Sequence, residues 1–163
     1  MNDKAIQHTR LEGVPDYIAA LDTLCNQARQ SLYFFEKDFD GTGFNAEMRY
    51  MMLRRFLLAS PNRRLYVLAH DMHYLSTQSP RMLMLLRQFG TSMFIHQTAP
   101  NLQHISEPFS VADDSSYVRR FHFEDPRGIF AQNDPEIART LKSRFMEMWA
   151  TSHQGISSTT LGL

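Results

Sequence analysis

The sequence predicts an α/β fold, with a mixed, largely parallel sheet and helices on both faces. Three observations predict it. Apolar runs of strand length alternate with amphipathic helical stretches up to about Gly90. Several short strand-like segments then follow Pro108, and a long amphipathic helix comes last. Alternation of this kind is typical of parallel strands whose connecting helices cover both faces of a sheet.

The chain of 163 residues has the size of one domain. Its hydrophobic content of 43% and charged content of 21% are ordinary for a soluble globular protein. No internal repeat or low-complexity linker divides it. We therefore expect a single α/β domain over residues 1–154, followed by a small, polar and disordered tail at 155–163.

The first elements follow from proline placement and helical spacing. A strand is expected at about Ile6–Leu11. Pro15 then begins a helix, because its missing N–H would be unpaired in the first turn anyway. This helix has Leu21, Leu24 and Cys25 at helical spacing, and we interpret Cys25, the only cysteine, as a small core residue.

A second helix is expected from Asn45, a good N-cap residue, to just before Pro61. Its apolar stripe includes Met48, Met51 and Phe56, which we assign to the core or to a partner-facing surface. The other expected elements are strands at 31–35, 63–71, 92–98, 108–113, 116–123 and 128–132 and a helix from Ser79 to about Gly90.

The last helix carries the clearest start signal in the chain. Asp134 is expected to be its cap and Pro135 its first residue. Leu141, Phe145 and Met148 recur at helical spacing and predict its buried face.

Seventeen basic and seventeen acidic residues give a formal net charge of zero. This balance removes the simplest electrostatic argument for nucleic-acid binding or for binding to an anionic membrane. The N-terminus lacks an apolar signal-peptide core, and no apolar run approaches the roughly 20 residues that span a bilayer. We therefore expect a cytoplasmic protein without a membrane span.

Polar residues gather after the predicted strands. In open α/β sheets, ligands bind beyond the carboxyl ends of the strands. His70 and Asp71 follow one apolar run, His96 ends another, and His104 lies in the loop beyond it. His96 is also compatible with an ordinary histidine that caps a strand. The sequence predicts that these ends carry the site.

Two possible ligand sets remain open. His70 and His73 have a spacing that resembles a metal pair, but no third ligand is fixed in the sequence, so we expect no metal and no cofactor. Arg119 and Arg120, with His122, have the chemistry of a bidentate phosphate clamp. They are equally compatible with solvated residues on an edge strand.

The order of the expected elements, together with "YVLAHD", "FSVADDSSYV" and "LKSRFMEMWATS", resembles a half-molecule of the phospholipase D superfamily over about Ile6 to Ser152. The chain is similar to small bacterial phospholipase D-like domains of unassigned function. The resemblance implies a His-x-Lys-x-x-x-x-Asp motif, in which the histidine attacks phosphorus and the lysine binds the phosphoryl oxygens. It also implies a homodimer, because two half-molecules normally face each other.

The motif is broken in this chain. If Asp113 is its aspartate, Pro108 stands at the lysine position and Ser106 at the histidine position. If His104 is its histidine, the lysine is again missing, since none lies between Lys37 and Lys142. Proline cannot bind phosphate as lysine does.

We therefore expect a non-catalytic phospholipase D-like domain that binds a small anionic ligand or a protein partner. The candidate ligand-binding residues are His70, Asp71, His104, Asp113, Arg119 and Arg120. The alternative is a divergent phosphodiesterase in which His104 is the catalytic residue and an arginine replaces the lysine. A third possibility is a structural or regulatory dimer module that binds no ligand.

Overall fold

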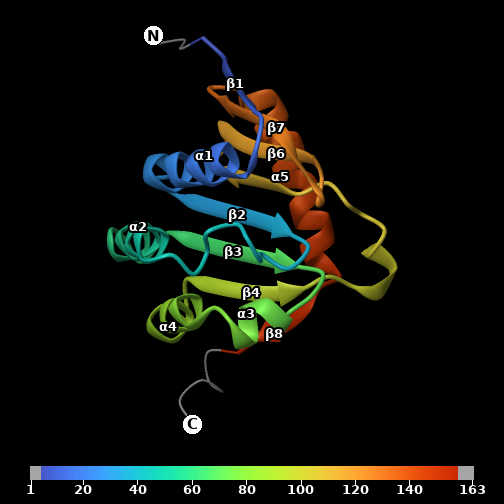
Figure 1. The fold of residues 1–163 in the computed structure, drawn as a ribbon. Helices are drawn as coiled ribbons and strands as arrows, with labels where there is room; N and C mark the ends of the chain where they lie inside the picture. Colours follow the sequence, from blue (N-terminus) through green and yellow to red (C-terminus); the bar gives the residue numbers. More distant parts are fainter. Residues whose placement is uncertain (1–4, 158–163) are drawn as a thin grey trace.

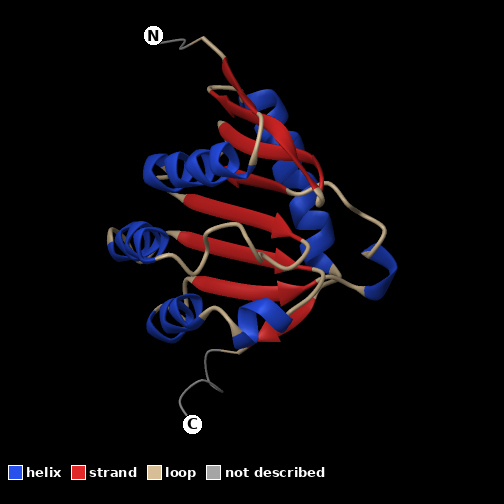
Figure 2. Ribbon diagram, in the orientation of Figure 1, coloured by secondary structure: helices blue, strands red, loops and turns tan. Residues whose placement is uncertain are grey.

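The backbone forms one eight-stranded sheet with helices on both faces, as the computed structural model of residues 5–157 shows (Figures 1 and 2). Its strands are β1 (Gln7–Leu11), β2 (Ser31–Glu36), β3 (Arg64–Ala69), β4 (Met93–Gln97), β5 (Phe109–Ala112), β6 (Ser116–His122), β7 (Asp125–Gln132) and β8 (His153–Ile156). Its helices are α1 (Val14–Gln27), α2 (Glu47–Leu58), α3 (His73–Thr77), α4 (Pro80–Gln88) and α5 (Pro135–Ala150), with a 3₁₀ turn at Pro100–Leu102.

The strand order is β1-β7-β6-β5-β2-β3-β4-β8. Only β2–β3 and β3–β4 are parallel among the described strands, so the expectation of a largely parallel sheet was wrong. The helical crossovers end at β4. After β4 the chain returns through a loop to place β5 antiparallel to β2, and β5, β6 and β7 follow as hairpins. Short turns can join only antiparallel neighbours.

Each face of the sheet has its own apolar core, because side chains alternate along the strands. Leu32 and Phe34 of β2 belong to the cluster that α1, α2 and α4 cover. Tyr33 and Phe35 belong to the opposite cluster, which α5 covers. Figure 1 shows α1, α2 and α4 lying together on one side and α5 crossing behind the strands. The expectation of helices on both faces is confirmed.

The capping residue expected from the sequence was right for α5 and wrong for α2. The Asp134 carboxylate accepts a hydrogen bond from the backbone N–H of Ile137, so this residue caps α5 as expected. Asn45, by contrast, does not cap α2, whose N-cap is Ala46. The Asn45 side chain instead accepts a hydrogen bond from the backbone N–H of Arg81 at the start of α4.

Two methionines of α2 face solvent, whereas Met52 packs partly against the core. Met48 is 66% exposed and Met51 is 54% exposed, so they are not core residues, and the alternative of a partner-facing surface stays a prediction. The buried side of α2 instead contains Arg49, which is 1% exposed and binds the Asp22 carboxylate of α1 at 2.7 Å. The buried face of α2 therefore consists of Arg49, Leu53, Phe56 and Leu57.

Strand β8 includes Gly155 and Ile156, which the sequence assigned to a disordered tail. It pairs with β4, where the Nδ1 atom of His96 lies 2.7 Å from the Ser152 hydroxyl. The rest of that expected tail, residues 158–163, lies outside the described residues. Within the described helices, none has the length and apolar character needed to cross a membrane.

A buried ion pair connects the two halves of the sheet. Glu36, the last residue of β2, accepts hydrogen bonds from Arg120 of β6 at 2.9 and 3.2 Å. The Tyr17 hydroxyl of α1 donates to the same carboxylate. The side chains of Glu36 and Arg120 are only 4% and 9% exposed. Burial raises the pKa of Glu36 to about 7, although Arg120 and Tyr17 act in the opposite direction.

We predict that Glu36→Ala lowers the free energy of unfolding by about 3–5 kcal/mol at pH 8, because it leaves the Arg120 charge buried and unpaired. Urea denaturation would measure this loss. Asp114→Ala is the matched control, since it breaks an exposed pair with Lys142 that is worth about 0–1 kcal/mol. Equal losses in the two variants would contradict the structural importance of the buried pair.

Candidate functional site

The carboxyl ends of the parallel strands open into a cavity of about 410 Å³, which we call the edge cavity. Lys37 follows β2, His70 and Asp71 follow β3, and His122 ends β6. Ser106, in the loop between β4 and β5, lines the same cavity. The turn from parallel to antiparallel strands therefore brings together polar groups from both halves of the sheet.

His70 is buried and fully hydrogen-bonded. Its Nε2 lies 2.7 Å from the Ile105 carbonyl oxygen, which can only accept, so this nitrogen carries the proton. Its Nδ1 lies 2.6 Å from the Thr98 hydroxyl, which itself accepts a hydrogen bond from Gln103. Burial lowers the pKa of His70, and nearby His104 and Lys37 lower it further. The ring is therefore neutral near pH 7 and holds the loop that carries Ser106.

The charges in the edge cavity are of both signs. Lys37 is exposed and forms no ion pair within residues 5–157. The Nδ1 atom of His122 accepts a hydrogen bond from the backbone N–H of Glu124, which leaves Nε2 as a donor toward solvent. Asp71 and Glu124 add carboxylates to the rim. The cavity can bind a phosphoryl group through Lys37 and His122 and can accept hydrogen bonds from hydroxyl or amino groups.

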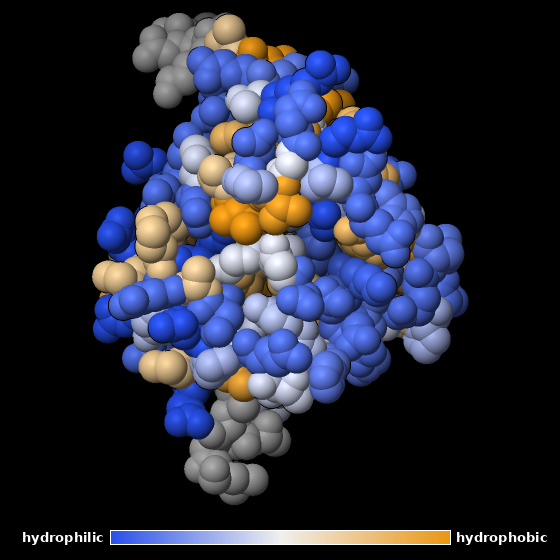
Figure 3. All heavy atoms as spheres, viewed as in Figure 1, coloured by the Kyte–Doolittle hydropathy of each residue, from blue (hydrophilic) through white to orange (hydrophobic). Residues whose placement is uncertain are grey.

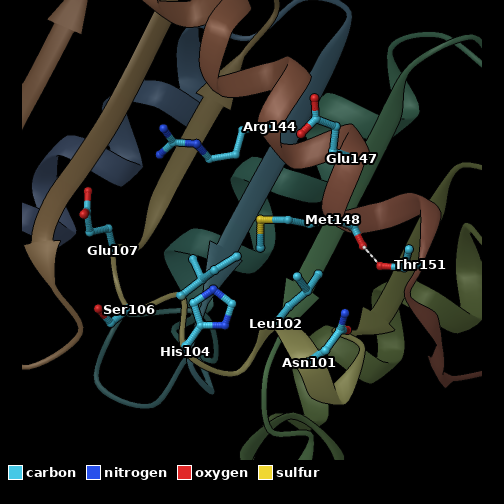
Figure 4. Close-up of a pocket in the computed structure, with 10 residues that line it drawn as sticks. Asn101, Leu102, His104, Ser106, Glu107, Arg144, Glu147, Met148 and Thr151 are labelled. Carbon is cyan, nitrogen blue, oxygen red and sulfur yellow. Dashed lines mark hydrogen bonds between the residues drawn. The ribbon is translucent and has the colours of Figure 1, made fainter.

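A second cavity, of about 470 Å³, lies on the other side of the same loop; we call it the helix cavity. Arg144 and Glu147 of α5 line it together with His104 and Glu107 of the loop; Figure 4 shows Arg144 extending on the side of Glu107, while the Glu147 carboxylate points away from the loop. Met148 forms part of the wall. Arg144 forms no ion pair with any described residue. This cavity holds an exposed imidazole and a guanidinium, with carboxylates beside both.

The six residues predicted from sequence do not form one site. His70 and Asp71 line the edge cavity, and His104 lines the helix cavity. Arg119 and Arg120 are adjacent on β6 and so lie on opposite faces of the sheet. The Arg119 guanidinium lies 3.6 Å from the Glu107 carboxylate, which also lines the helix cavity.

Two of these six residues, Arg120 and Asp113, form hydrogen bonds within the fold that occupy their side chains. The Arg120 guanidinium is buried against Glu36 and donates to the Phe123 carbonyl oxygen. Asp113 lies at the opposite, amino edge of the parallel strands, where its carboxylate accepts the backbone N–H groups of residues 29–31. Neither side chain reaches the two cavities.

Lys37 and Arg144 were not among the candidate ligand-binding residues predicted from the sequence. Lys37 could have been found, because it directly follows a parallel strand, where ligand-binding residues gather. Arg144 gives no such signal, since an exposed arginine on a helix is ordinary. It becomes notable only because the loop at 101–107 crosses in front of α5. Among residues 5–157, no three histidine, cysteine, aspartate or glutamate side chains are arranged to bind a metal ion.

We predict that the imidazole of His70 titrates below the ordinary histidine pKa of about 6.5. Since the folded state then binds protons less readily than the unfolded state, this residue favours folding above about pH 6.5, and that contribution falls as the pH drops below it. Two-dimensional NMR of the ring nitrogens, assigned with His70→Gln, would measure the pKa and the tautomer. A pKa above 6.5 would contradict the neutral network.

The fold is that of the phospholipase D family. Nuc from Salmonella typhimurium, described as a phospholipase D family member, superposes with a TM-score of 0.67 at 12% identity, over 94% of this chain and 99% of that one. NucT from Helicobacter pylori gives a TM-score of 0.60 at 13% identity, over 92% and 99% of the two chains. The resemblance expected from sequence is therefore confirmed at the level of fold.

The archaeal chromatin protein TrmBL2, whose structure is described as showing a novel mode of DNA binding, gives a TM-score of 0.67 at 10% identity. The match covers 94% of this chain but 55% of TrmBL2, so this chain spans about half of that protein. No curated protein matches the sequence. A family model described as a domain of unknown function, DUF7931, matches residues 14–159. The chain belongs to this family of phospholipase D-like fold.

Proposed function

We propose that this domain is non-catalytic and binds a small anionic ligand in the edge cavity. The observation that carries the proposal is Lys37. In the alignment on Asp113, Pro108 and Ser106 stand where the phospholipase D motif has its lysine and histidine. Lys37, at the end of β2, supplies one cation to the cavity in place of the motif's lysine. Position 106 is a serine, so it supplies no nucleophilic imidazole.

The neighbouring histidines support binding rather than chemistry. Both ring nitrogens of His70 are already hydrogen-bonded, so this ring cannot attack phosphorus or accept a proton without breaking its network. His122 has one ring nitrogen free to donate to a phosphoryl oxygen. Asp71 and Glu124 favour a ligand that also carries hydroxyl or amino groups.

The divergent-enzyme alternative requires His104 and a cation to converge on one phosphate. Arg120 is buried in its pair with Glu36, and Arg119 contacts Glu107. Arg144 is the arginine that shares a cavity with His104, and Glu107 and Glu147 line that cavity too. Among residues 5–157, no side chain or backbone group hydrogen-bonds the His104 ring, so nothing described orients or activates it as a nucleophile, which favours the non-catalytic proposal. The homodimer and the cytoplasmic location stay predictions.

We predict that Lys37→Ala weakens the binding of phenyl phosphate at least about tenfold, because a hydrogen bond to a charged group contributes about 1.5–3 kcal/mol. NMR titration would measure the dissociation constant and should shift the signals of Lys37, His122 and residues 103–106. Lys142→Ala is the control, since that lysine pairs with Asp114 away from the cavity. Unchanged affinity in Lys37→Ala, or shifts confined to other surfaces, would reject the proposed site.

We also predict no turnover of a bis-aryl phosphodiester. Release of the aryl alcohol, followed by absorbance, should match that of the His104→Ala and His122→Ala variants. Turnover that disappears in His104→Ala would favour the divergent-enzyme alternative with the helix cavity as its site. Turnover that disappears only in His122→Ala would move catalysis to the edge cavity and would contradict a non-catalytic domain.

A further inference from the structure

We propose a second anion site at the amino edge of the parallel strands, built from Arg29, Arg55 and Arg63 and selective for phosphoryl groups. These arginines line one hollow of about 260 Å³. The hollow lies where α1 and α2 end and β2 and β3 begin. Figure 3 shows strongly hydrophilic side chains interspersed with apolar ones along this edge, at the left of the view.

Three different segments bring the arginines together. Arg29 belongs to the connection between α1 and β2, Arg55 to the last turn of α2, and Arg63 to the connection between α2 and β3. Arg63 is held in place, because its Nη1 donates to the Phe56 carbonyl oxygen at 3.2 Å and its guanidinium lies 5.1 Å from the centre of the Phe56 ring.

The loop that carries Arg29 is also fixed. The Asp113 carboxylate accepts hydrogen bonds from the backbone N–H groups of Arg29, Gln30 and Ser31 at 2.8–3.2 Å. The side chain of Arg29, however, forms no hydrogen bond or ion pair with any residue from 5 to 157, and neither does that of Arg55. The protein therefore orders the backbone here and leaves these two guanidinium groups available.

No carboxylate lines the hollow. Two acidic groups of neighbouring segments are already bound: Asp22 pairs with Arg49 at 2.7 Å, and the Asp113 carboxylate accepts backbone N–H groups of residues 29–31. Three positive charges thus share one hollow in a chain whose formal net charge is zero. Positive charges that share one hollow repel each other, and a bound anion offsets this repulsion because each guanidinium attracts it.

The shape and lining indicate the chemical class. Guanidinium groups bind phosphoryl oxygens in a planar, bidentate manner that suits phosphate better than halide. Buried apolar side chains, Cys25 and Phe56, form part of the wall and reduce the access of water. The volume accommodates one or two phosphoryl groups, either free or as the headgroup of an anionic lipid. For the second source, α2 also exposes apolar surface: Leu58 in the same last turn as Arg55, and Met48 and Met51 earlier along the helix.

This site is separate from the edge cavity. Arg29 precedes β2 and Lys37 follows it, and the six residues of β2 span about 20 Å. A ligand at one site therefore cannot contact the other, and the two sites are distinguishable by substitution.

Titration calorimetry with inorganic pyrophosphate at about 50 mM salt tests the inference. The double variant Arg29→Gln/Arg55→Gln should bind at least about tenfold more weakly than the unsubstituted chain. Arg54→Gln is the matched control, because Arg54 is the exposed neighbour of Arg55 on α2 and does not line the hollow. Arg54→Gln should retain this binding. Lys37→Ala removes only the contribution of the edge cavity, so in a Lys37→Ala background the substitutions at Arg29 and Arg55 should still abolish the remaining binding.

A second arm, cosedimentation with vesicles that contain phosphatidic acid, identifies the source of the phosphoryl group. In either arm, binding that is lost in the double variant and retained in Arg54→Gln supports the site. Binding of pyrophosphate assigns a soluble ligand, whereas binding of vesicles alone assigns a lipid headgroup. If Arg54→Gln weakened binding as much as the double variant, the loss would be explained by the change in net charge, and the inference would be overturned. Loss in Lys37→Ala alone would place the anion in the edge cavity and overturn it too, while the proposed function would stand.

Discussion

The buried pair of Glu36 and Arg120 is the interaction on which the arrangement of both halves of the sheet depends. Removing a carboxylate and a guanidinium from water costs several kcal/mol per ion, so further hydrogen bonds are needed to offset the burial of the pair. Here Tyr17 donates to the carboxylate and Arg120 donates to the Phe123 carbonyl oxygen, while the buried Nε of Arg120 has no hydrogen-bond partner among the described residues. These bonds tie α1, β2 and the β6–β7 turn together, and they thereby place His122 across the cavity from Lys37.

The loop between β4 and β5 is the second constraint, because it determines how many cavities this end of the sheet has. His70 holds this loop in place through hydrogen bonds of its ring nitrogens with the Ile105 carbonyl oxygen and the Thr98 hydroxyl. The loop therefore separates the edge cavity from the helix cavity and contributes Ser106 to both. A neutral, structurally bonded histidine at a strand end thus organises the candidate site without taking part in its chemistry.

Sequence periodicity predicted the positions of the helices and strands better than it predicted whether neighbouring strands run parallel or antiparallel. The helix that begins at Pro135 and the parallel strands β2–β4 were accessible from local pattern and capping residues. The antiparallel return after β4 was not, because apolar alternation is the same in both directions. The same limit explains the site: Arg120 and Asp113 looked like ligand-binding residues, but the register of β5 and β6 places one beneath Glu36 and the other at the far edge.

Asp113, which the sequence alignment placed in the phospholipase D motif, has a structural role in the fold. The carboxylate lies in the turn after β5, at a residue with a positive φ of 55°, and it binds three successive backbone N–H groups before and at the start of β2. Those groups belong to a connection that no strand or helix satisfies, so an apolar residue at position 113 would leave them without partners. This role requires neither the histidine nor the lysine of the motif. The aspartate therefore has a structural role of its own, and it orders the segment that carries Arg29 at the amino edge of the parallel strands.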